Sequence, residues 1–226
     1  MMKTEIHRLS LRFCHCYVIK EEGLILVDAG FPNQGGKFAK ELKDLSINPR
    51  DISLILLTHG HYEHIGSVNE IKKLTGGKIA INQHEKNWVE QALKPPLPPG
   101  TNLWGNMIGA IYSLAGSFIN FSGTPVDLVL EDKEYPLEYH GIHGKVLYTP
   151  GHSSGSMSLL LDTGDAFVGD LAMNGLPMRI GPGMPIFAEN VGALKESWRL
   201  LLNSGAKRIH PAHGKPFNAD ELRKIL

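Results

Sequence analysis

The sequence predicts an α/β fold in which two mixed β-sheets pack face to face with helices outside them. Three observations carry this prediction. In the first half of the chain, short apolar runs alternate with helical patterns, from residues 12–19 to 78–82. In the second half, several strand candidates follow one another before a helical stretch near 188–203. The length of 226 residues suits one domain over 1–226 with a sizeable core.

The first predicted element is a β-hairpin. Residues 12–19 and 24–28 have strand character, and the polar turn at 20–23 joins them. The following stretch AGFPNQGG interrupts regular structure. Apolar residues then recur at helical spacing from about 37 to 45, which predicts a helix.

The next elements continue the alternation of strand and helix. The apolar run at 51–58 is short and flanked by turn residues, as is typical of a strand buried on both faces. A helix is expected at about 66–75, because Gly76 and Gly77 would stop it, and a short strand is expected at 78–82.

The segment 94–125 differs from its surroundings. It begins with the proline-rich stretch KPPLPPG, and its apolar remainder is punctuated by Gly and Ser, which predicts one or two short helices laid over a surface. The elements expected after it are strands at about 126–130, 142–149, 156–161, 165–169 and 207–210, a helix near 188–203, and a last helix over 218–226 capped by Asn218.

Composition and the N-terminal sequence indicate which partners and which cellular location to expect. Lys plus Arg and Asp plus Glu each number 23, so no net field favours nucleic acid or anionic lipid, and neither is expected as a partner. The N-terminus lacks the apolar core of a signal peptide, which favours the cytoplasm. The apolar stretch 107–121 is too short and too polar for a membrane span. Cys14 and Cys16 are poorly placed to bridge each other and are expected as reduced, buried thiols.

A cluster of metal-ligand side chains directly follows the apolar run at 51–58. His59, His61, Glu63 and His64 occupy six consecutive positions. Imidazole and carboxylate are the ligand types that hold zinc, iron or manganese at neutral pH. In extended chain His59 and His61 fall on one side, and the next two donors can wrap around the same point. Four donors from one loop, together with others, suit two metals that share a water better than one metal.

Three further candidate ligands lie far along the chain. His152, Asp170 and His213 each follow an apolar, strand-like run and have Gly or Pro beside them. Such residues occur where a backbone must turn sharply to aim a side chain. The repetition predicts that the three side chains converge on the first cluster.

These motifs resemble those of the metallo-β-lactamase-fold superfamily, whose signature H-x-H-x-D-H is followed by separated His, Asp and His ligands. The resemblance runs from about Cys16 to Pro216, and the combined motifs are highly specific. It implies an αββα sandwich with the metals at one edge. The ligands that it implies are His59, His61 and His152 for the first metal, Glu63, His64 and His213 for the second, and Asp170 bridging both.

The chain departs from this family at Glu63, where Asp is usual. The extra methylene must push the second metal outward or be absorbed by a different rotamer. Three outcomes follow: a working second site, a weakened one, or a preference for another metal. We expect Glu63 to be a working ligand, and Glu63 and Asp170 are the candidate catalytic carboxylates.

Four other side chains lie near these motifs. Asp28 matches an aspartate that the family places behind the ligands, where it would accept the ring N–H of a metal-bound histidine; the alternative is a simple turn aspartate. His15 is expected to be a partner buried in the sheet. His84 and His210 flank the motifs and are left out of the ligand set.

The ligand set predicts a metal-dependent hydrolase that acts on a small molecule. A water between two divalent cations loses its proton near neutral pH, and the hydroxide can attack a carbonyl or phosphoryl centre. The expected reaction is hydrolysis of an ester, thioester, lactone, amide or phosphodiester. Two zinc ions are expected, with iron or manganese as alternatives. The T-P-G-H-S-x-G-S form around His152 is common among glyoxalase-II-like relatives, which favours thioester or lactone substrates over β-lactams.

Two other functions compete with hydrolysis. With iron, the same scaffold supports sulfur dioxygenase or diiron oxygen and nitric oxide chemistry, but His61 stands where the diiron relatives place a carboxylate. A non-catalytic metal protein is disfavoured, because structural zinc sites are usually closed by four ligands that are often cysteines.

The segment 94–125 has two candidate roles. It can be a lid-like insertion that covers the metal edge and lines a pocket for a hydrophobic group, or it can form the interface of a homodimer. Both remain open at this point. Arg179 is expected to be solvated, with contact to an anionic substrate as the alternative.

Overall fold

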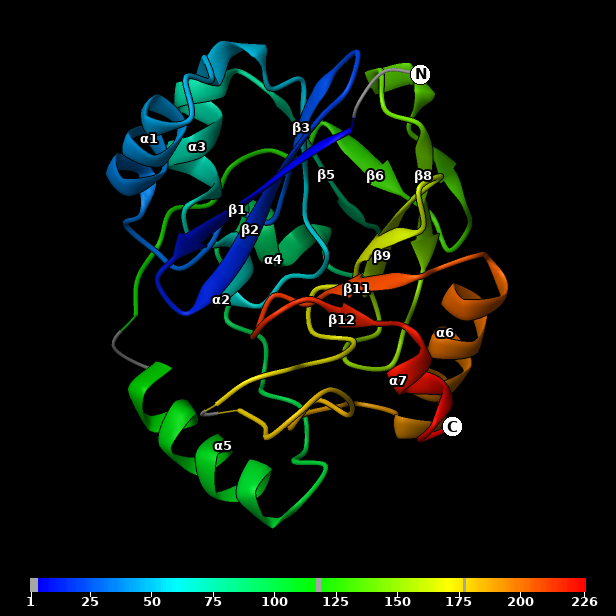
Figure 1. Ribbon diagram of the computed structural model, residues 1–226. Coiled ribbons are helices and arrows are strands. Elements are labelled where there is room, and N and C mark those ends of the chain that lie inside the picture. The colour runs from blue at the N-terminus through cyan, green and yellow to red at the C-terminus, as the bar shows by residue number, and fades with distance from the viewer. Residues whose placement is uncertain (1–3, 117–118, 177) are drawn as a thin grey trace.

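The strands of the computed structural model, which describes residues 4–116, 119–176 and 178–226, form two six-stranded sheets (Figure 1). The first sheet is mixed, because its first three strands pair antiparallel and its last four pair parallel. Its spatial order is β1 (Glu5–Leu11), β2 (Cys14–Lys20), β3 (Leu24–Val27), β4 (Leu54–Leu56), β5 (Lys78–Asn82) and β6 (Leu128–Leu130).

The second sheet is also mixed. Only the pair β10–β11 is parallel, and its other pairs are antiparallel. Its spatial order is β12 (Phe217–Asn218), β11 (Arg208–His210), β10 (Asp165–Phe167), β9 (Met157–Leu161), β8 (Gly144–Tyr148) and β7 (Tyr135–Pro136).

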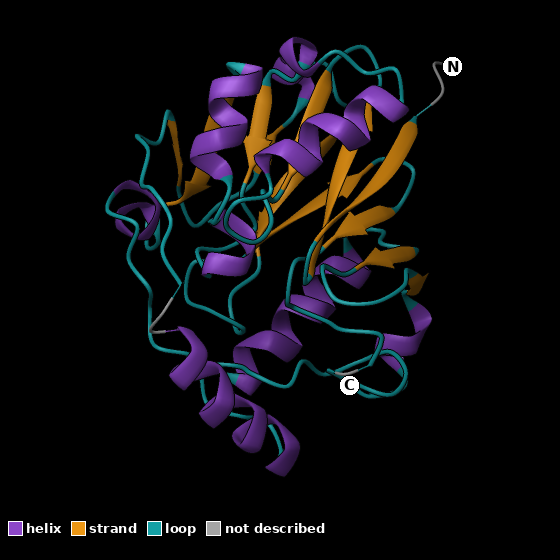
Figure 2. Cartoon of the chain, turned by 90° about the vertical axis from the view of Figure 1, so that its left-hand side faces the viewer, coloured by secondary structure: helices purple, strands orange, loops and turns teal. Residues whose placement is uncertain are grey.

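The two sheets pack face to face, and helices cover their outer faces (Figure 2). Buried side chains such as Ile25 and Leu56 from the first sheet meet Leu159 and Phe167 from the second. On the first sheet lie α1 (Gly35–Asp44), α2 (Tyr62–Ile65), α3 (Val68–Thr75) and α4 (Lys86–Glu90). On the second lie α6 (Val191–Asn203) and α7 (Asp220–Arg223). This αββα sandwich confirms the predicted fold class.

The helix ends follow local sequence chemistry. Gly76 ends α3 with a left-handed backbone at φ 74°, which glycine adopts at little cost. Asn190 begins α6, where its side chain accepts the N–H of Ala193 at 3.0 Å. The last helix is shorter than expected, since it begins only at Asp220; the Asn218 side chain nevertheless accepts the N–H of that residue at 2.8 Å.

Several short or marginal elements were not predicted. The edge strand β1 was missed because its side chains are only partly buried, so it lacks a clean apolar pattern. The strand expected at 12–19 begins at Cys14, because Arg12, at φ 71°, and Phe13 form the turn from β1. The strand expected at 51–58 is limited to β4 and follows a 3₁₀ turn, Pro49–Asp51. A second 3₁₀ turn, Glu138–His140, and the elements α4, β7 and β12 were also missed.

The described residues of the segment 94–125 contain one helix, α5 (Leu103–Gly116), where one or two short helices were expected. It lies apart from both sheets, at the lower end of the molecule in Figures 1 and 2. The chain before it is anchored to a later segment, because Thr101 donates from its N–H to the carbonyl of Ile186 at 2.8 Å. Leu97 and Ile108 pack against a small buried cluster of Met173, Ile186 and Phe187.

Two further expectations concern cysteines and membranes. Cys14 and Cys16 are free and buried, as predicted. Of the helices in the described part of the chain, none combines the length and the apolar character that a membrane crossing requires.

Candidate metal centre

All seven side chains singled out in the sequence lie buried at one edge of the sandwich, each 0 to 6% exposed. They fall into two sets, and within each set the potential ligand atoms lie within 4.8 Å of one another. One set is His59, His61 and His152, and the other is Glu63, His64, Asp170 and His213. The predicted convergence of distant segments is therefore present in the fold.

Glycines before two of these residues make the approach possible. Gly151 precedes His152 at φ 140°, and Gly169 precedes Asp170 at φ 52°. A Cβ on Gly169 would lie 2.4 Å from the Thr58 hydroxyl oxygen, and one on Gly151 would lie 2.4 Å from the backbone of Leu194. A side chain at either position would collide with its neighbours, so glycine lets the loops pack beside the strand ends.

In the first set, nitrogen atoms face one another at close range. His152 Nε2 lies 3.0 Å from His61 Nδ1, and the His59 ring centroid lies 4.7 Å from each of their ring centroids. His152 Nδ1 donates to the carbonyl of Phe187 at 3.0 Å, which leaves Nε2 with its lone pair. Two ring nitrogens at this distance need a proton or a cation between them.

The pKa values of these three histidines favour the neutral ring. Burial lowers the pKa of His59 and His61 well below the usual value and also lowers that of His152. The neighbouring imidazoles act in the same direction. Neutral imidazole is the form that binds a metal, so the set presents lone pairs near neutral pH.

Asp170 lies between the two sets. Its Oδ1 is 3.4 Å from His64 Nε2 and 3.2 Å from His213 Nε2, and its Oδ2 is 3.7 Å from His152 Nε2. Burial would raise the pKa of Asp170, but His213 and His64 outweigh it and hold that pKa well below its usual range. Burial raises the pKa of Glu63. One ionised carboxylate thus faces imidazoles of both sets.

Unpartnered atoms test whether these residues suit a metal. Five buried side-chain nitrogen or oxygen atoms in the described part of the chain have no hydrogen-bond partner. Four of them belong to these sets: His59 Nε2, Glu63 Oε2, His64 Nε2 and Asp170 Oδ1. Buried polar atoms without partners are costly and rare, and these are all metal-ligand atoms aimed at one place. The donor chemistry therefore fits divalent cations.

Asp28 stands behind both sets and fixes the orientation of two imidazoles. Its Oδ2 accepts the ring N–H of His64 at 2.9 Å, and its Oδ1 accepts the backbone N–H of Thr58 at 2.8 Å. The Thr58 hydroxyl donates to this carboxylate at 3.0 Å and can accept the Nδ1–H of His59 at 3.1 Å. Both histidines then present Nε2 to the centre. Of the two roles left open for Asp28, the geometry favours the supporting one.

The backbone at Asp28 is itself unusual. Its φ is 61°, in the left-handed region that non-glycine residues rarely adopt, although Asp is among the more tolerant. Strain of this kind persists where the surrounding structure fixes it and often marks functional sites. Here it lets the chain leave β3 with the carboxylate turned toward His64.

Glu85 is a supporting residue that the sequence analysis missed. Its Oε2 accepts the N–H of Gly60 at 2.5 Å, and its Oε1 accepts the N–H of Gly155 at 2.9 Å. One buried carboxylate therefore clamps the loop of His59 and His61 to the loop of His152. Glu85 follows the end of β5, so its place after a strand was an available signal.

Two tyrosines connect α5 to the centre. The rings of Tyr62 and Tyr112 stack with centroids 5.6 Å apart and planes at 17°. Their hydroxyls are hydrogen-bonded to each other. Burial, followed by the charge of Glu63, raises the pKa of Tyr112. Tyr112 thus lies against the second set, and spacing alone gave no sign of this.

The other residues considered in the sequence lie outside the two sets. His84 pairs with Asp132 at 2.9 Å, and His210 pairs with Asp165 at 2.8 Å. His15 is only half buried in β2, and burial, with smaller effects of Arg8 and His213, lowers its pKa to about 4.

The expectation of a solvated Arg179 is wrong. Its side chain is half buried and donates to the carbonyl oxygens of Gly181 at 3.0 Å and Met184 at 3.1 Å. A guanidinium group has five N–H donors in a rigid plane and can bind several carbonyl oxygens of one turn. The Arg179 side chain therefore stabilises its own Gly/Pro-rich loop.

Comparison with curated proteins identifies similar metallo-hydrolases. A probable metallo-hydrolase of Bacillus subtilis, YqgX, is 28% identical over 160 residues, which are 70% of this chain and 65% of that protein. The chain thus spans a little less than two thirds of this relative. Another from the same organism, the probable metallo-hydrolase YflN, is 26% identical and aligns over 95% of this chain and 88% of its own length.

Solved structures show the same fold. The B3 metallo-β-lactamase BLEG-1 superposes with a TM-score of 0.69 at 21% identity and covers 99% of this chain and 97% of its own. ST1585 from Sulfolobus tokodaii, an archaeal metallo-β-lactamase superfamily protein, gives 0.65 at 18% identity over 98% and 84%. The model of the metallo-β-lactamase superfamily matches residues 9–213, which include all seven residues of the two sets. The chain therefore belongs to the metallo-β-lactamase superfamily.

Proposed function

We propose that this protein is a hydrolase that uses two divalent metal ions, expected to be zinc, to cleave an ester, thioester, lactone or related bond in a small molecule. The observation that carries the proposal is the pair of buried donor sets with Asp170 between them. Its metallo-hydrolase relatives and its superfamily support metal-dependent hydrolysis in general.

The residues divide into two proposed metal sites. His59, His61 and His152 would hold the first ion, and Glu63, His64 and His213 the second, with Asp170 shared between them. When bound, the two ions would lower the pKa of a shared water, supply a hydroxide nucleophile and polarise the bond to be cleaved.

The protein's own contribution is orientation. Asp28, directly and through Thr58, keeps Nε2 of His64 and His59 aimed at the centre, and Glu85 holds the two histidine loops together. Asp170 and Glu63 are the proposed catalytic carboxylates, since as ligands they would hold the ions beside the attacking water.

Exclusion of bulk water is the proposed role of the 94–125 insertion as a lid. Tyr112 reaches from α5 to Tyr62 beside Glu63, and Ile108 of the same helix packs on the buried cluster that contains Phe187. The carbonyl of Phe187 holds His152, so the insertion contacts the supports of both donor sets. An apolar cover beside a polar centre suits a substrate with a hydrophobic group, and thioesters or lactones remain the preferred classes.

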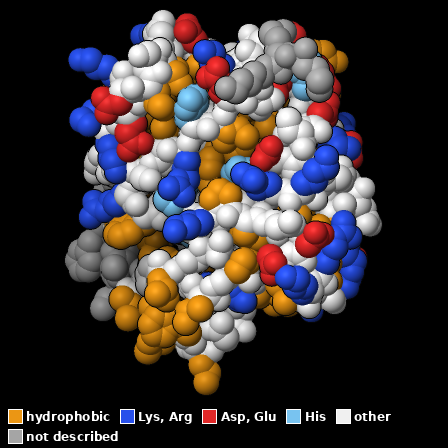
Figure 3. Space-filling model, in the orientation of Figure 1, with side chains coloured by type: hydrophobic (Ala, Val, Ile, Leu, Met, Phe, Trp, Pro, Cys, Tyr) orange, Lys and Arg blue, Asp and Glu red, His pale blue; other side chains and the backbone are white. Residues whose placement is uncertain are grey.

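The opposite face of α5 bears on the proposed homodimer. Leu103 is 88% exposed and Ile111 60%, and Trp104 and Met107 are also exposed. Hydrophobic side chains gather over α5 at the lower end of the molecule in Figure 3. A second copy packing on this face would bury them. Sedimentation equilibrium tests this proposal, and a monomer at all protein concentrations would contradict it.

The first test of the site is His61→Ala. The variant loses a ligand of the first site, so we expect metal content to fall from two ions per chain and hydrolysis of a panel of esters, thioesters and lactones to be lost. Elemental analysis and kinetics measure both. His84→Ala is the control, because His84 pairs with Asp132 away from the centre. Unchanged turnover in His61→Ala would contradict the assignment.

The same elemental analysis separates the redox alternative. A protein purified without added metal that contains stoichiometric iron, absorbs visible light and reacts with oxygen would replace the hydrolase proposal.

A second test addresses Glu63. Glu63→Gln keeps the size but removes the charge, so we expect affinity for the second metal to fall at least about tenfold and turnover to fall with it. Glu63→Asp restores the residue usual in the family and should retain both. Competition with a chromogenic chelator measures the affinities. If Glu63→Gln binds two ions as tightly as the natural protein, Glu63 is not a ligand.

A third test addresses Asp28. Asp28→Asn would place an amide against His64, disturb the tautomer of that ring and weaken metal binding by roughly 10- to 100-fold. Asp132→Asn removes the carboxylate of the surface pair with His84 and serves as the matched control. Equal metal affinity of the two variants would reduce Asp28 to a turn residue.

A further inference from the structure

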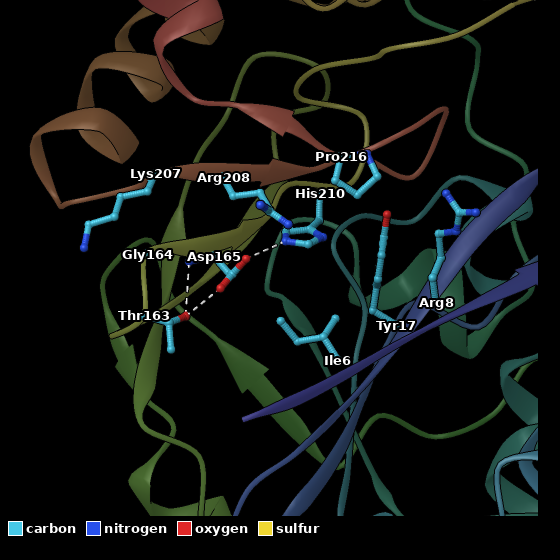
Figure 4. Close-up of a pocket in the computed structure, with 10 residues that line it drawn as sticks. All are labelled: Ile6, Arg8, Tyr17, Thr163, Gly164, Asp165, Lys207, Arg208, His210 and Pro216. Atoms are coloured by element: carbon cyan, nitrogen blue, oxygen red, sulfur yellow. Dashed lines mark hydrogen bonds and ion pairs between the residues drawn. The ribbon is translucent and has the colours of Figure 1, made fainter. Parts of the chain in front are cut away.

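A pocket separate from the candidate metal centre lies at the edge of the sandwich. It has a volume of about 660 Å³, and none of the seven residues of the two donor sets lines it. One wall comes from β1 and β2 with Ile6, Arg8 and Tyr17. The other comes from the turn before β10 and from β11, with Asp165 and His210 (Figure 4). The two sheets therefore each supply a wall.

His210 is the central residue of this pocket. It is 6% exposed, and its ring stacks on Phe167 with centroids 4.6 Å apart and planes at 21°. His210 Nε2 donates to Asp165 Oδ1 at 2.8 Å. Figure 4 shows the imidazole between Asp165 and Tyr17, so the ring is held from three sides.

The second ring nitrogen of His210 has no partner. Nδ1 is the one atom outside the metal centre among the buried unpartnered side-chain atoms of the described residues. The nearby Tyr17 hydroxyl donates to the carbonyl of Pro211 at 2.7 Å and so is already engaged. A buried ring nitrogen without a hydrogen bond is unfavourable, and a molecule in the pocket could supply the missing bond.

The charge of the lining indicates the class of molecule. Three cationic side chains, Arg8, Lys207 and Arg208, line the pocket, against the single carboxylate of Asp165. That carboxylate already accepts from His210 and from the Thr163 hydroxyl at 2.7 Å. In Figure 4 the Arg208 guanidinium lies beside His210, whereas Arg8 lies beyond Tyr17 on the opposite side and the Lys207 ammonium points away. Arg208 is thus the nearer guanidinium to His210, and Arg8 lies across the pocket on the far side of Tyr17.

We propose that this pocket binds the anionic group of a small molecule, a phosphate or a carboxylate, beside Arg208. The imidazolium form of His210, balanced by Asp165, would donate its Nδ1–H to the anion, and Arg8 would add positive charge from the opposite wall. Guanidinium groups are suited to both oxyanions through paired N–H bonds. The volume falls within the range of roughly 300–1,000 Å³ that is usual for small-molecule sites, and it exceeds that of a bare anion. Ile6 and Pro216 would contact the rest of the ligand.

Titration calorimetry with inorganic phosphate and, separately, with citrate tests this proposal. Arg208→Gln and Arg8→Gln remove the charges at exposed positions, and Arg199→Gln, on the surface of α6 beside Glu196, is the matched control. Each is measured in the natural protein and with His61→Ala added, because phosphate can also bind metal ions. Binding at the pocket should survive His61→Ala, so this result does not depend on the proposed hydrolase function.

The expected result is saturable binding of at least one anion that weakens about tenfold or more in Arg208→Gln, less in Arg8→Gln, and not in Arg199→Gln. A shift of the His210 ring nitrogen resonances on titration would place the anion at this imidazole. Binding of phosphate alone assigns a phosphate ligand, and binding of citrate alone assigns a carboxylate ligand. Absence of binding by both anions, or equal binding by Arg208→Gln and Arg199→Gln, would overturn the proposal.

Discussion

The burial of seven imidazole and carboxylate side chains at one sheet edge is the constraint on which the rest of the structure depends. An ion removed from water without compensation costs several kcal/mol, and facing lone pairs repel one another. Hydrogen bonds satisfy the outward-facing atoms, such as His64 Nδ1 and His152 Nδ1, but leave four inward-facing atoms without partners. The surrounding fold must therefore hold together side chains whose lone pairs repel one another. Bound cations would offset this repulsion.

The sandwich meets this constraint through rigid strands and a few hydrogen bonds behind the ligands. Five of the seven residues lie in loops that follow strands, and Glu63 and His64 lie in the short helix α2 directly after one of these loops. Asp28 joins the end of β3 to the loop after β4, and Glu85 joins that loop to the one after β8. Each is a single carboxylate that accepts bonds from two segments. The side chains of the two donor sets are thus oriented by residues, Asp28 and Glu85, that need not contact a metal or a substrate themselves.

The sequence predicted the parts of this arrangement that are local or repeated. His59, His61, Glu63 and His64 are close in the chain, and the distant ligands share the pattern of a strand followed by a glycine-bounded turn. Glu85 also follows a strand but has no glycine beside it, and Tyr112 carries no such pattern; their roles arise only when the loops and α5 are brought together. Arg179 was misjudged for a different reason: its partners are backbone carbonyl groups of its own loop, and residue types do not reveal how that loop turns. The edge strand β1 was not predicted because its side chains are partly exposed to solvent, so its sequence has no clear apolar pattern.

The strand β2 and the segment from His210 to His213 connect the metal centre with the separate pocket. His210 lines the pocket, and His213 belongs to the second donor set three residues later. Between them, the Tyr17 hydroxyl holds the carbonyl of Pro211 at 2.7 Å, and the N–H of His15 holds that of Ala212 at 2.8 Å. Energetic coupling between sites requires an element with two arrangements. This segment is tied to β2 at both intervening residues, which favours one arrangement. The same contacts with β2 therefore support both His210 of the pocket and His213 of the second donor set.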